Sequence, residues 1–162
     1  MVCEEERQIE HKATIVGVDL GGTKIATALL TTDGDVLARV RLDTSSEEGP
    51  EAVIQRMCQS VKDVKKEHDI LGIGVATPGP LDSEKGVVLH SPNLAGWKNV
   101  PLRDELHERL QAEVKVENDA NAAAWGEYVF GAGRGTRHMV YITISTGIGS
   151  GLVLDGELFT GS

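Results

Sequence analysis

The stretch Ile15-Val-Gly-Val-Asp-Leu-Gly-Gly-Thr-Lys-Ile-Ala-Thr-Ala-Leu-Leu30 decides the fold of this chain. Its two apolar runs are rich in β-branched residues and are joined by a turn of Gly, Gly and Thr, which predicts a β-hairpin. A second stretch, Tyr141-Ile-Thr-Ile-Ser-Thr-Gly-Ile-Gly-Ser-Gly-Leu-Val-Leu154, repeats the pattern. Backbone amides in such turns can point at an anion, so the pair predicts two lobes that grip one nucleotide from opposite sides.

Each turn taken alone also fits an ordinary hairpin, whose glycines merely supply positive φ angles. Two better known phosphate motifs do not occur. No Walker A sequence leads into Lys24, and the glycines at 147–151 lead into an apolar strand rather than into the helix that a dinucleotide-binding fingerprint requires. The repetition therefore favours phosphate binding by two hairpin turns.

The composition limits the classes of partner. The 162 residues include 16 basic and 25 acidic side chains, for a net charge of −9 at neutral pH, which disfavours binding to nucleic acid or to an anionic membrane. No apolar run reaches the roughly 20 residues of a membrane-spanning helix. The two cysteines, Cys3 and Cys58, offer neither a disulfide framework nor a zinc site. We expect a soluble, cytoplasmic protein with no nucleic-acid or membrane partner.

The rest of the pattern predicts an α/β fold. Thr32-Asp-Gly-Asp35 predicts a two-residue turn into a third antiparallel strand over 36–42, and Pro50 opens an amphipathic helix. The apolar run at 70–76 then predicts a buried strand in a parallel position. The elements expected next are a loop with one short strand at 87–89, a helix from Pro101, a strand at 114–117, a helix at 120–130 and the second hairpin.

Three regions are expected along the chain. Residues 1–12 are rich in Glu and form an acidic extension that we expect to be disordered. Residues 13–133 form an amino-terminal lobe, and residues 134–162 begin a second, nucleotide-binding lobe that is truncated. We place the lobe boundary near the glycines at 131–135, because the chain has no Pro- or Ser-rich linker.

The first turn offers groups for phosphate and metal. Gly21 and Gly22 let the backbone approach a phosphate closely, and Thr23 adds a hydroxyl donor. Lys24 belongs to the same predicted phosphate-binding set. Asp19, at the end of the preceding strand, is suited to hold Mg²⁺ through water.

Asn118-Asp119 lies where a strand ends and a helix begins. A helix N-terminus favours an ionised carboxylate, so Asp119 can accept a proton from a substrate hydroxyl as that hydroxyl attacks phosphorus. The alternative is that Asp119 only caps the helix. The Asn118 amide is suited to a sugar hydroxyl, and for this residue too a capping role is the alternative.

Two loops complete the candidate pocket. Thr77-Pro-Gly-Pro80 presents backbone at the end of a strand, where α/β sheets meet ligands, although it also fits a rigid turn. His90 and Asn93 in the next loop are weaker candidates, since a single loop residue of either type is more often local structure. Trp97 and Trp125 are expected to pack rather than to stack on a sugar.

These residues together resemble the bacterial ROK sugar kinases, in particular their glucokinases, which belong to the actin/hexokinase/Hsp70 ATPase-like superfamily. The resemblance covers about residues 14–162. It implies a ribonuclease H-like, actin-like lobe with a mixed sheet of three antiparallel strands and then parallel strands with crossover helices, followed by the first hairpin of a second lobe. It rests on Asp19-Leu-Gly-Gly-Thr-Lys24, Ala76-Thr-Pro-Gly-Pro80, Ser91-Pro-Asn-Leu94 with Gly96-Trp97, Asn118-Asp-Ala-Asn121 and Thr146-Gly-Ile-Gly149.

The resemblance also implies an activity, which is ATP-dependent transfer of phosphate to the 6-hydroxyl of a hexose, with ATP and Mg²⁺ as cofactors. Asp119 would be the general base. The residues implied to hold the sugar are Gly79, Asn93, Asn118 and Asp119. Those implied for the first phosphate loop are Gly21, Gly22 and Thr23, and those for the second are Thr146, Gly147 and Gly149.

This chain also differs from the family pattern. In the family, a Gly-Glu-x-Gly-His sugar-binding segment, a cysteine-rich zinc motif and most of the nucleotide-binding lobe follow the second hairpin, so zinc is expected only in that downstream half. We therefore expect this chain to be a fragment, with exposed apolar surface that favours a dimer. Two other functions remain open. One is a sugar-responsive ROK transcriptional repressor, which needs a winged-helix segment ahead of Thr14, and the other is a noncatalytic sugar-binding or assembly module.

Overall fold

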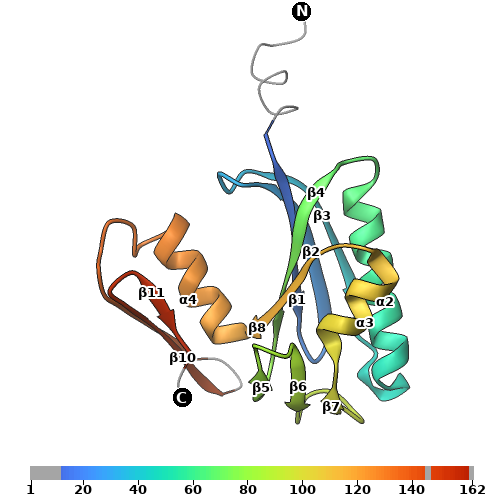
Figure 1. Cartoon of the computed structure of the whole chain (residues 1–162). Coiled ribbons are helices and arrows are strands. Elements are labelled where there is room, and N and C mark those ends of the chain that lie inside the picture. Colours follow the sequence, from blue (N-terminus) through green and yellow to red (C-terminus); the bar gives the residue numbers. More distant parts are fainter. Residues whose placement is uncertain (1–11, 145–146, 161–162) are drawn as a thin grey trace, which may run out of the picture. The chain divides into compact units, whose positions relative to one another are not determined.

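The computed structural model describes residues 12–144 and 147–160 (Figure 1). Their contacts divide into two units, Met1–Val116 and Glu117–Ser162, which are described separately below. The predicted disorder of the acidic extension falls almost wholly outside the described residues, and so does Thr146 of the second predicted phosphate loop. The expected lobe boundary near residue 133 stays a prediction.

The first unit is built on a mixed sheet of β1 (Thr14–Leu20), β2 (Lys24–Thr31), β3 (Val36–Asp43), β4 (Ile70–Thr77) and β8 (Val114–Asn118). The strand order is β3-β2-β1-β4-β8. β1 pairs antiparallel with β2 and parallel with β4, and β2 pairs antiparallel with β3. This confirms the expected three antiparallel strands followed by a crossover into a parallel position.

Two helices supply most of the cover for this sheet, α2 (Pro50–Lys65) and α3 (Leu102–Leu110). They contact each other and lie on the same side of the sheet (Figure 1). Pro50 stands in the first turn of α2, where its missing N–H costs nothing. The predicted apolar face of α2 is buried, and it shares one continuous core with the inward side chains of the strands. The members of that face are Val53, Met57, Val61 and Val64.

The turn between β2 and β3 differs from the prediction of a two-residue turn. The Thr31 N–H donates to the Asp35 carbonyl at 2.9 Å, so three residues lie in the turn. Gly34 has a φ of 96°, and the register shifts between Leu29 and Leu30. A three-residue hairpin loop that ends in a left-handed glycine commonly carries such a bulge.

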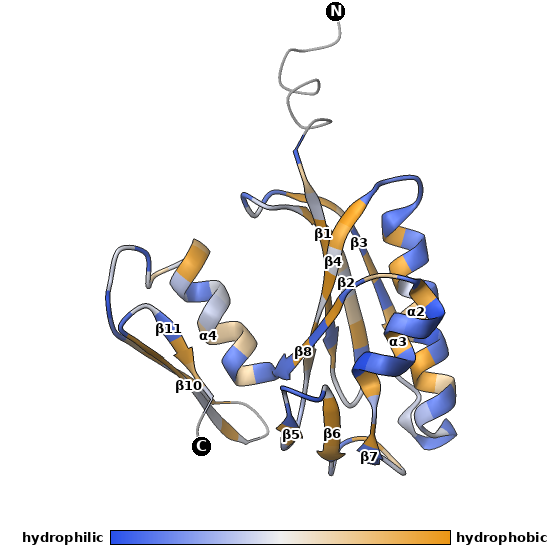
Figure 2. Ribbon diagram, in the orientation of Figure 1, coloured by the Kyte–Doolittle hydropathy of each residue, from blue (hydrophilic) through white to orange (hydrophobic). Residues whose placement is uncertain are grey.

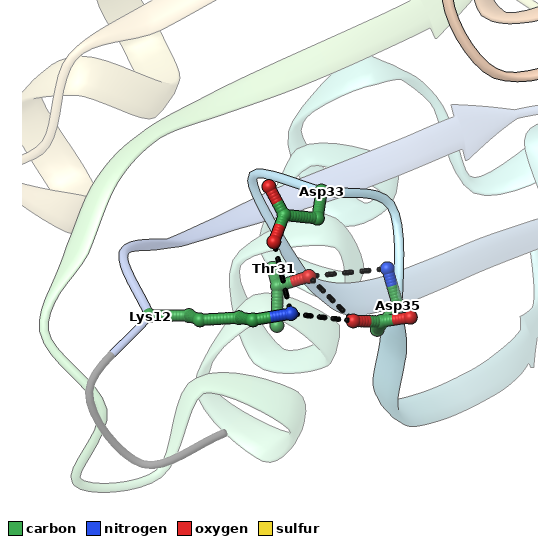
Figure 3. Close-up of polar contacts among 4 residues, drawn as sticks. All are labelled: Lys12, Thr31, Asp33 and Asp35. Atoms are coloured by element: carbon green, nitrogen blue, oxygen red, sulfur yellow. Dashed lines mark hydrogen bonds and ion pairs between the residues drawn. The ribbon is translucent and has the colours of Figure 1, made fainter. Parts of the chain in front are cut away.

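Lys12 ties the start of the described chain to this turn (Figure 3). Its ammonium group pairs with Asp33 at 2.9 Å and with Asp35 at 3.1 Å. The Thr31 hydroxyl donates to the same Asp35 carboxylate at 3.4 Å, and it accepts from the Asp35 N–H at 3.1 Å. The hydrogen bonds to Asp33 and Asp35 raise the pKa of Lys12.

A small antiparallel sheet stands where the sequence predicted a loop with one short strand. Its strands are β5 (Leu81–Asp82), β6 (Val87–His90) and β7 (Lys98–Val100), in the order β5-β6-β7. Only the middle strand was expected. β5 and β7 are two and three residues long, which is too short to show an alternating pattern in the sequence.

The second unit consists of α4 (Asp119–Phe130) and a sheet of β9 (Met139–Ile144), β10 (Ile148–Leu154) and β11 (Glu157–Phe159), in the order β11-β10-β9. The expected helix and second hairpin are confirmed. Gly149 and Gly151 lie under α4, because a Cβ on Gly151 would come within 2.5 Å of the Ala124 Cβ. Trp125, which was expected to pack, is 41% exposed and stacks on Tyr128.

No helix in the two described ranges combines the length and the apolar character needed to cross a bilayer.

Candidate functional site

The first predicted phosphate turn, residues 21–24, joins β1 to β2. The Gly21 N–H donates to the Lys24 carbonyl at 2.9 Å and closes the turn. The N–H groups of Gly22 and Thr23 donate to no other group in the described part of the chain. Two consecutive unpaired amides in a turn are an arrangement that suits an anion. The turn therefore has the donors that the predicted phosphate contact requires.

Thr44, the residue after β3, holds this turn in place. The sequence pattern did not predict a role for it. Its hydroxyl donates to the Gly21 carbonyl at 2.7 Å, and its N–H donates to the Thr23 carbonyl at 2.9 Å. Thr44 is fully buried, and its own carbonyl accepts from Arg56 of α2 at 3.1 Å. The strand register points to Thr44, because Lys24 pairs with Asp43 and Thr44, the residue after Asp43, therefore lies beside the turn.

Lys24 already has an anionic partner. Its ammonium group forms an ion pair with Asp43, the residue opposite it in register. The hydrogen bond from Lys24 lowers the pKa of the Asp43 carboxyl group. A phosphate contact from Lys24 therefore has to compete with this carboxylate.

Two predicted site residues from separate loops meet beside the turn. A Cβ on Gly22 would lie 2.9 Å from the Asn93 carbonyl oxygen, so glycine is what allows the two backbones to approach. Asn93 is exposed, whereas Leu94 and Trp97 anchor its loop in the core. The expectation that Trp97 packs is confirmed.

The Thr77-Pro-Gly-Pro80 loop meets the same segment. Gly79 has a φ of 91°, and a Cβ at this position would lie 2.4 Å from the His90 carbonyl oxygen. Both observations restrict the position to glycine. In the first unit, Gly22 and Gly79 thus both lie against the segment 90–93, which contains Asn93. The ligand contacts predicted for these three residues stay predictions.

Asn118 caps α4 in the second unit. Its side-chain oxygen accepts from the N–H of Ala120 at 3.0 Å and from the N–H of Asn121 at 3.3 Å. Asn118 is therefore the N-cap residue, as the capping alternative for this residue predicted, while the catalytic role of Asp119 stays a prediction. Asp119 is the first residue of the helix, it is exposed, and its carboxylate accepts from the Ala120 N–H at 2.9 Å. Negative charge is favourable in the first turn of a helix.

Glu117 stabilises the junction between β8 and α4, and the sequence pattern did not predict this role. One of its carboxylate oxygens accepts from the Asn118 N–H at 2.8 Å and from the Asn121 side-chain amide at 3.0 Å. The hydrogen bond from Asn121 joins the end of β8 to the first turn of α4. Glu117 lies in the strand and not on the helix, so no helical spacing in the sequence points to it.

The second predicted phosphate turn is only partly described. Gly147 lies in the turn, and a Cβ there would meet no atom within 4 Å. Gly149 lies inside β10, where it pairs with Thr143, and its Cβ position is 3.1 Å from the Ala120 Cβ. Close packing of α4 on the sheet thus accounts for Gly149, and its phosphate contact stays a prediction.

Asp19 is the next-to-last residue of β1, close to the first turn, and it is exposed. Mg²⁺ commonly keeps several waters and takes one or two carboxylates, so a single aspartate at this position fits a water-mediated contact. No group of three or more His, Cys, Asp or Glu side chains that could hold a metal occurs among the described residues.

Comparisons with known proteins show which family this chain resembles. Residues 15–162 match the family model described as "ROK family". The chain is 46% identical over 150 residues to a curated glucokinase of Thermotoga maritima, a match that covers 93% of this chain and 47% of that protein. It is 34% identical over 154 residues to a xylose repressor of Caldicellulosiruptor bescii, which covers 92% of this chain and 38% of the repressor.

Solved structures show the same likeness. A ROK family glucokinase from Streptomyces griseus, in complex with glucose and AMPPNP, matches with a TM-score of 0.86 at 37% identity and covers 93% of this chain and 47% of that one. The mixed sheet and these neighbours define an α/β protein of the actin-like ATPase fold. Within that class, the chain belongs to the ROK family. It spans about half the length of the curated relatives that it matches.

Proposed function

We propose that this chain supplies the amino-terminal part of an ATP-dependent sugar kinase, and specifically of a glucokinase that phosphorylates the 6-hydroxyl of its sugar. One observation carries the proposal. Asn118 takes the capping role at α4, so the Asp119 carboxylate stands exposed at the first position of the helix. The likeness to glucokinases supports the choice of substrate, with fructose, mannose and N-acetylmannosamine as the alternatives.

In the proposed reaction, the Asp119 carboxylate accepts the proton of the sugar 6-hydroxyl as that oxygen attacks the γ-phosphorus of ATP. The O–H bond breaks while the new O–P bond forms, and ADP leaves. Asn118 and Glu117 fix the backbone at the start of α4 through the hydrogen bonds described above. A carboxylate on a fixed backbone needs little reorganisation before it accepts the proton.

The remaining residues bind and orient the two substrates in this proposal. The amides of Gly22 and Thr23 donate to phosphate oxygens, and Thr44 keeps their turn closed. Asp19 would hold Mg²⁺ through water, which supplies positive charge to the phosphates. The proposed sugar contacts are the loops that carry Gly79 and Asn93 in the first unit, and Asn118 in the second. Thr146, Gly147 and Gly149 form the second phosphate contact, and the proposed location is the cytoplasm, where the buried free Cys58 stays reduced.

The test is made on the full-length enzyme with Asp119→Asn. Turnover should fall by about 10²–10⁴-fold because the general base is lost, whereas the dissociation constant for glucose should change by only a few fold. Glucose 6-phosphate production measures the first quantity and calorimetry the second. Asp104→Asn is the matched control, since Asp104 is an exposed aspartate in the first turn of α3.

Unchanged turnover in Asp119→Asn would reduce Asp119 to a structural residue. The repressor relative supports a second candidate function, in which the protein binds sugar without phosphorylating it. Wild-type protein that binds glucose but transfers no phosphate from ATP would favour that function, or a noncatalytic sugar-binding or assembly module.

A further inference from the structure

Three polar side-chain atoms of the first unit are buried and have no hydrogen-bond partner among the residues that the structure describes. They are the hydroxyl oxygens of Thr77 and Ser91 and the indole nitrogen of Trp97, and these residues are at most 2% exposed. An unpaired polar group in a protein interior lowers stability, and the large majority of such groups in native proteins are hydrogen-bonded to protein or to ordered water. These three atoms therefore need a partner.

Ser91 and Trp97 lie side by side at the end of the small sheet. The Ser91 N–H donates to the Trp97 carbonyl at 3.3 Å, next to the pair of His90 with Lys98. Successive side chains of a strand point to opposite faces. His90 and Lys98 are exposed, whereas Ser91 and Trp97 are buried. The Ser91 hydroxyl and the Trp97 indole therefore both point into the core.

The Thr77 hydroxyl comes from the neighbouring segment, at the end of β4. Thr77 lies on the buried side of this strand with Ile73 and Val75, because these alternate residues are all buried. Two residues further on, a Cβ on Gly79 would lie 3.3 Å from the Ser91 Cα. The three buried atoms therefore belong to two chain segments that are in contact at Ser91, and all three side chains point inward.

Water fits this set of atoms better than an ion does. A cation is held by several oxygen ligands, whereas an indole N–H can only donate. An anion would be costly to bury among uncharged groups. Hydroxyl groups both donate and accept, and a buried water typically makes about three hydrogen bonds to polar groups that lack another partner.

We propose that one buried water molecule joins these three side chains. The Trp97 N–H donates to the water oxygen, and the water donates its two hydrogens to the hydroxyl oxygens of Thr77 and Ser91. The water holds the segment that carries Asn93 against the loop that carries Gly79. Both loops contact the sugar in the proposed function, and the role of the water in sugar binding rests on that proposal. Thr77, Ser91 and Trp97 are then positioning residues, because they are buried and act on the sugar through Gly79 and Asn93.

The water itself is tested by NMR on isotope-labelled protein. The Trp97 indole N–H should show a cross-peak to a long-lived water, and Ser91→Ala should remove it. Trp125 is the matched control, because this residue is 41% exposed and its indole N–H should show only exchange with bulk water. A rotating-frame experiment separates the two kinds of cross-peak by sign. A wild-type protein without a water cross-peak at Trp97 would overturn the proposal.

The sign of the change in melting temperature gives a second test. Thr77→Val keeps the shape of the side chain and removes only its hydroxyl. The melting temperature should fall by about 3 °C because the hydrogen bond to the water is lost. Thr27→Val should lower it in the same way, since the buried Thr27 hydroxyl is bonded to Ser60 at 2.7 Å. An unchanged or higher melting temperature for Thr77→Val would show an unpaired hydroxyl and would contradict the proposal.

The positioning role is tested on the full-length enzyme. Thr77→Val should raise the KM for glucose several-fold and leave kcat nearly unchanged, because the sugar loops are loosened while the general base is intact. Thr27→Val is the matched control, because it loses a buried hydrogen bond in β2 and should keep the wild-type KM. An unchanged KM in Thr77→Val, or an equal rise in both variants, would overturn the positioning role. A full-length wild type without kinase activity would contradict the proposed function instead, and the NMR and melting results would still decide on the water.

Discussion

The two units differ in how completely they bury their apolar side chains. The hydrophobic core of the first unit contains 21 buried residues, all between Val16 and Val116. Among the hydrophobic side chains in the described part of the second unit, those of Ala120, Ala124 and Val153 are buried, and the ribbon of β10 is coloured in part as hydrophobic (Figure 2). A stable domain needs a covered face on each of its packed layers. The first unit therefore holds its own core, whereas the described residues of the second unit leave most of their large hydrophobic side chains exposed.

The largest expected effect is a cavity in the first unit. Leu20→Ala should lower the free energy of unfolding by about 3 kcal/mol, because Leu20 is fully buried in the core. Urea denaturation followed by circular dichroism measures the change. Leu71→Ala removes a leucine that is 66% exposed on a neighbouring strand and should cost less than about 0.5 kcal/mol. Equal losses in the two variants would mean that the first unit has no specific core.

A smaller effect is expected where α4 packs on the second sheet. Gly151→Ala places a Cβ within 2.5 Å of the Ala124 Cβ and 2.8 Å of the Ala120 carbonyl oxygen, so the helix has to move away. The expected cost is about 1–3 kcal/mol, read from faster amide exchange in α4 and β10. The control is Gly147→Ala, which meets nothing within 4 Å and should leave exchange unchanged. If Gly151→Ala left amide exchange in α4 and β10 unchanged, as its control should, the close approach of helix and sheet would be wrong.

The smallest effect concerns an exposed ion pair between α2 and α3. The Arg109 guanidinium donates to both carboxylate oxygens of Glu51, at 2.8 and 2.7 Å, and these bonds lower the pKa of Glu51. A folded pKa below the unfolded one stabilises the protein above the unfolded pKa, and this contribution is lost as the pH falls through the folded value.

Glu51→Gln should therefore lower the urea midpoint slightly at pH 7. The difference from wild type should shrink as the pH falls below the unfolded pKa of about 4.3, and it should vanish once the pH is below the lowered folded pKa. Glu67→Gln changes an exposed residue that has no ion pair among the described residues, and its midpoint should follow the wild type at every pH. A difference for Glu51→Gln that persisted in acid would show that the carboxylate charge is not its cause.

Most of the fold could be predicted because its signals are local. Apolar alternation located β1 and β2, and helical spacing behind Pro50 located α2. The short strands β5 and β7 could not be found this way, since pairing with β6 rather than their own pattern makes them strands. The three-residue turn after β2 depends on a bulge, which composition does not reveal.

The candidate site was predictable in its residue types and less so in its geometry. Asn118 and Asp119 are both good helix caps. The Ala120 N–H donates to both side chains, and only the hydrogen bond from the Asn121 N–H to Asn118 separates their roles. Thr44 lies 21 residues beyond Thr23 and meets the first turn only through the strand register. Asn93 approaches Gly22 through the tertiary fold. Such contacts join distant segments and leave no periodic pattern in the sequence.

Hydrogen exchange followed by mass spectrometry on this chain tests the contrast between the units most directly. The amides of β1, β2 and β4 should be strongly protected, because these strands carry the buried core of the first unit. The amides of β9 and β10 should exchange much faster, because the described residues of the second unit bury few hydrophobic side chains. Equal protection of the strands of both units would contradict the account.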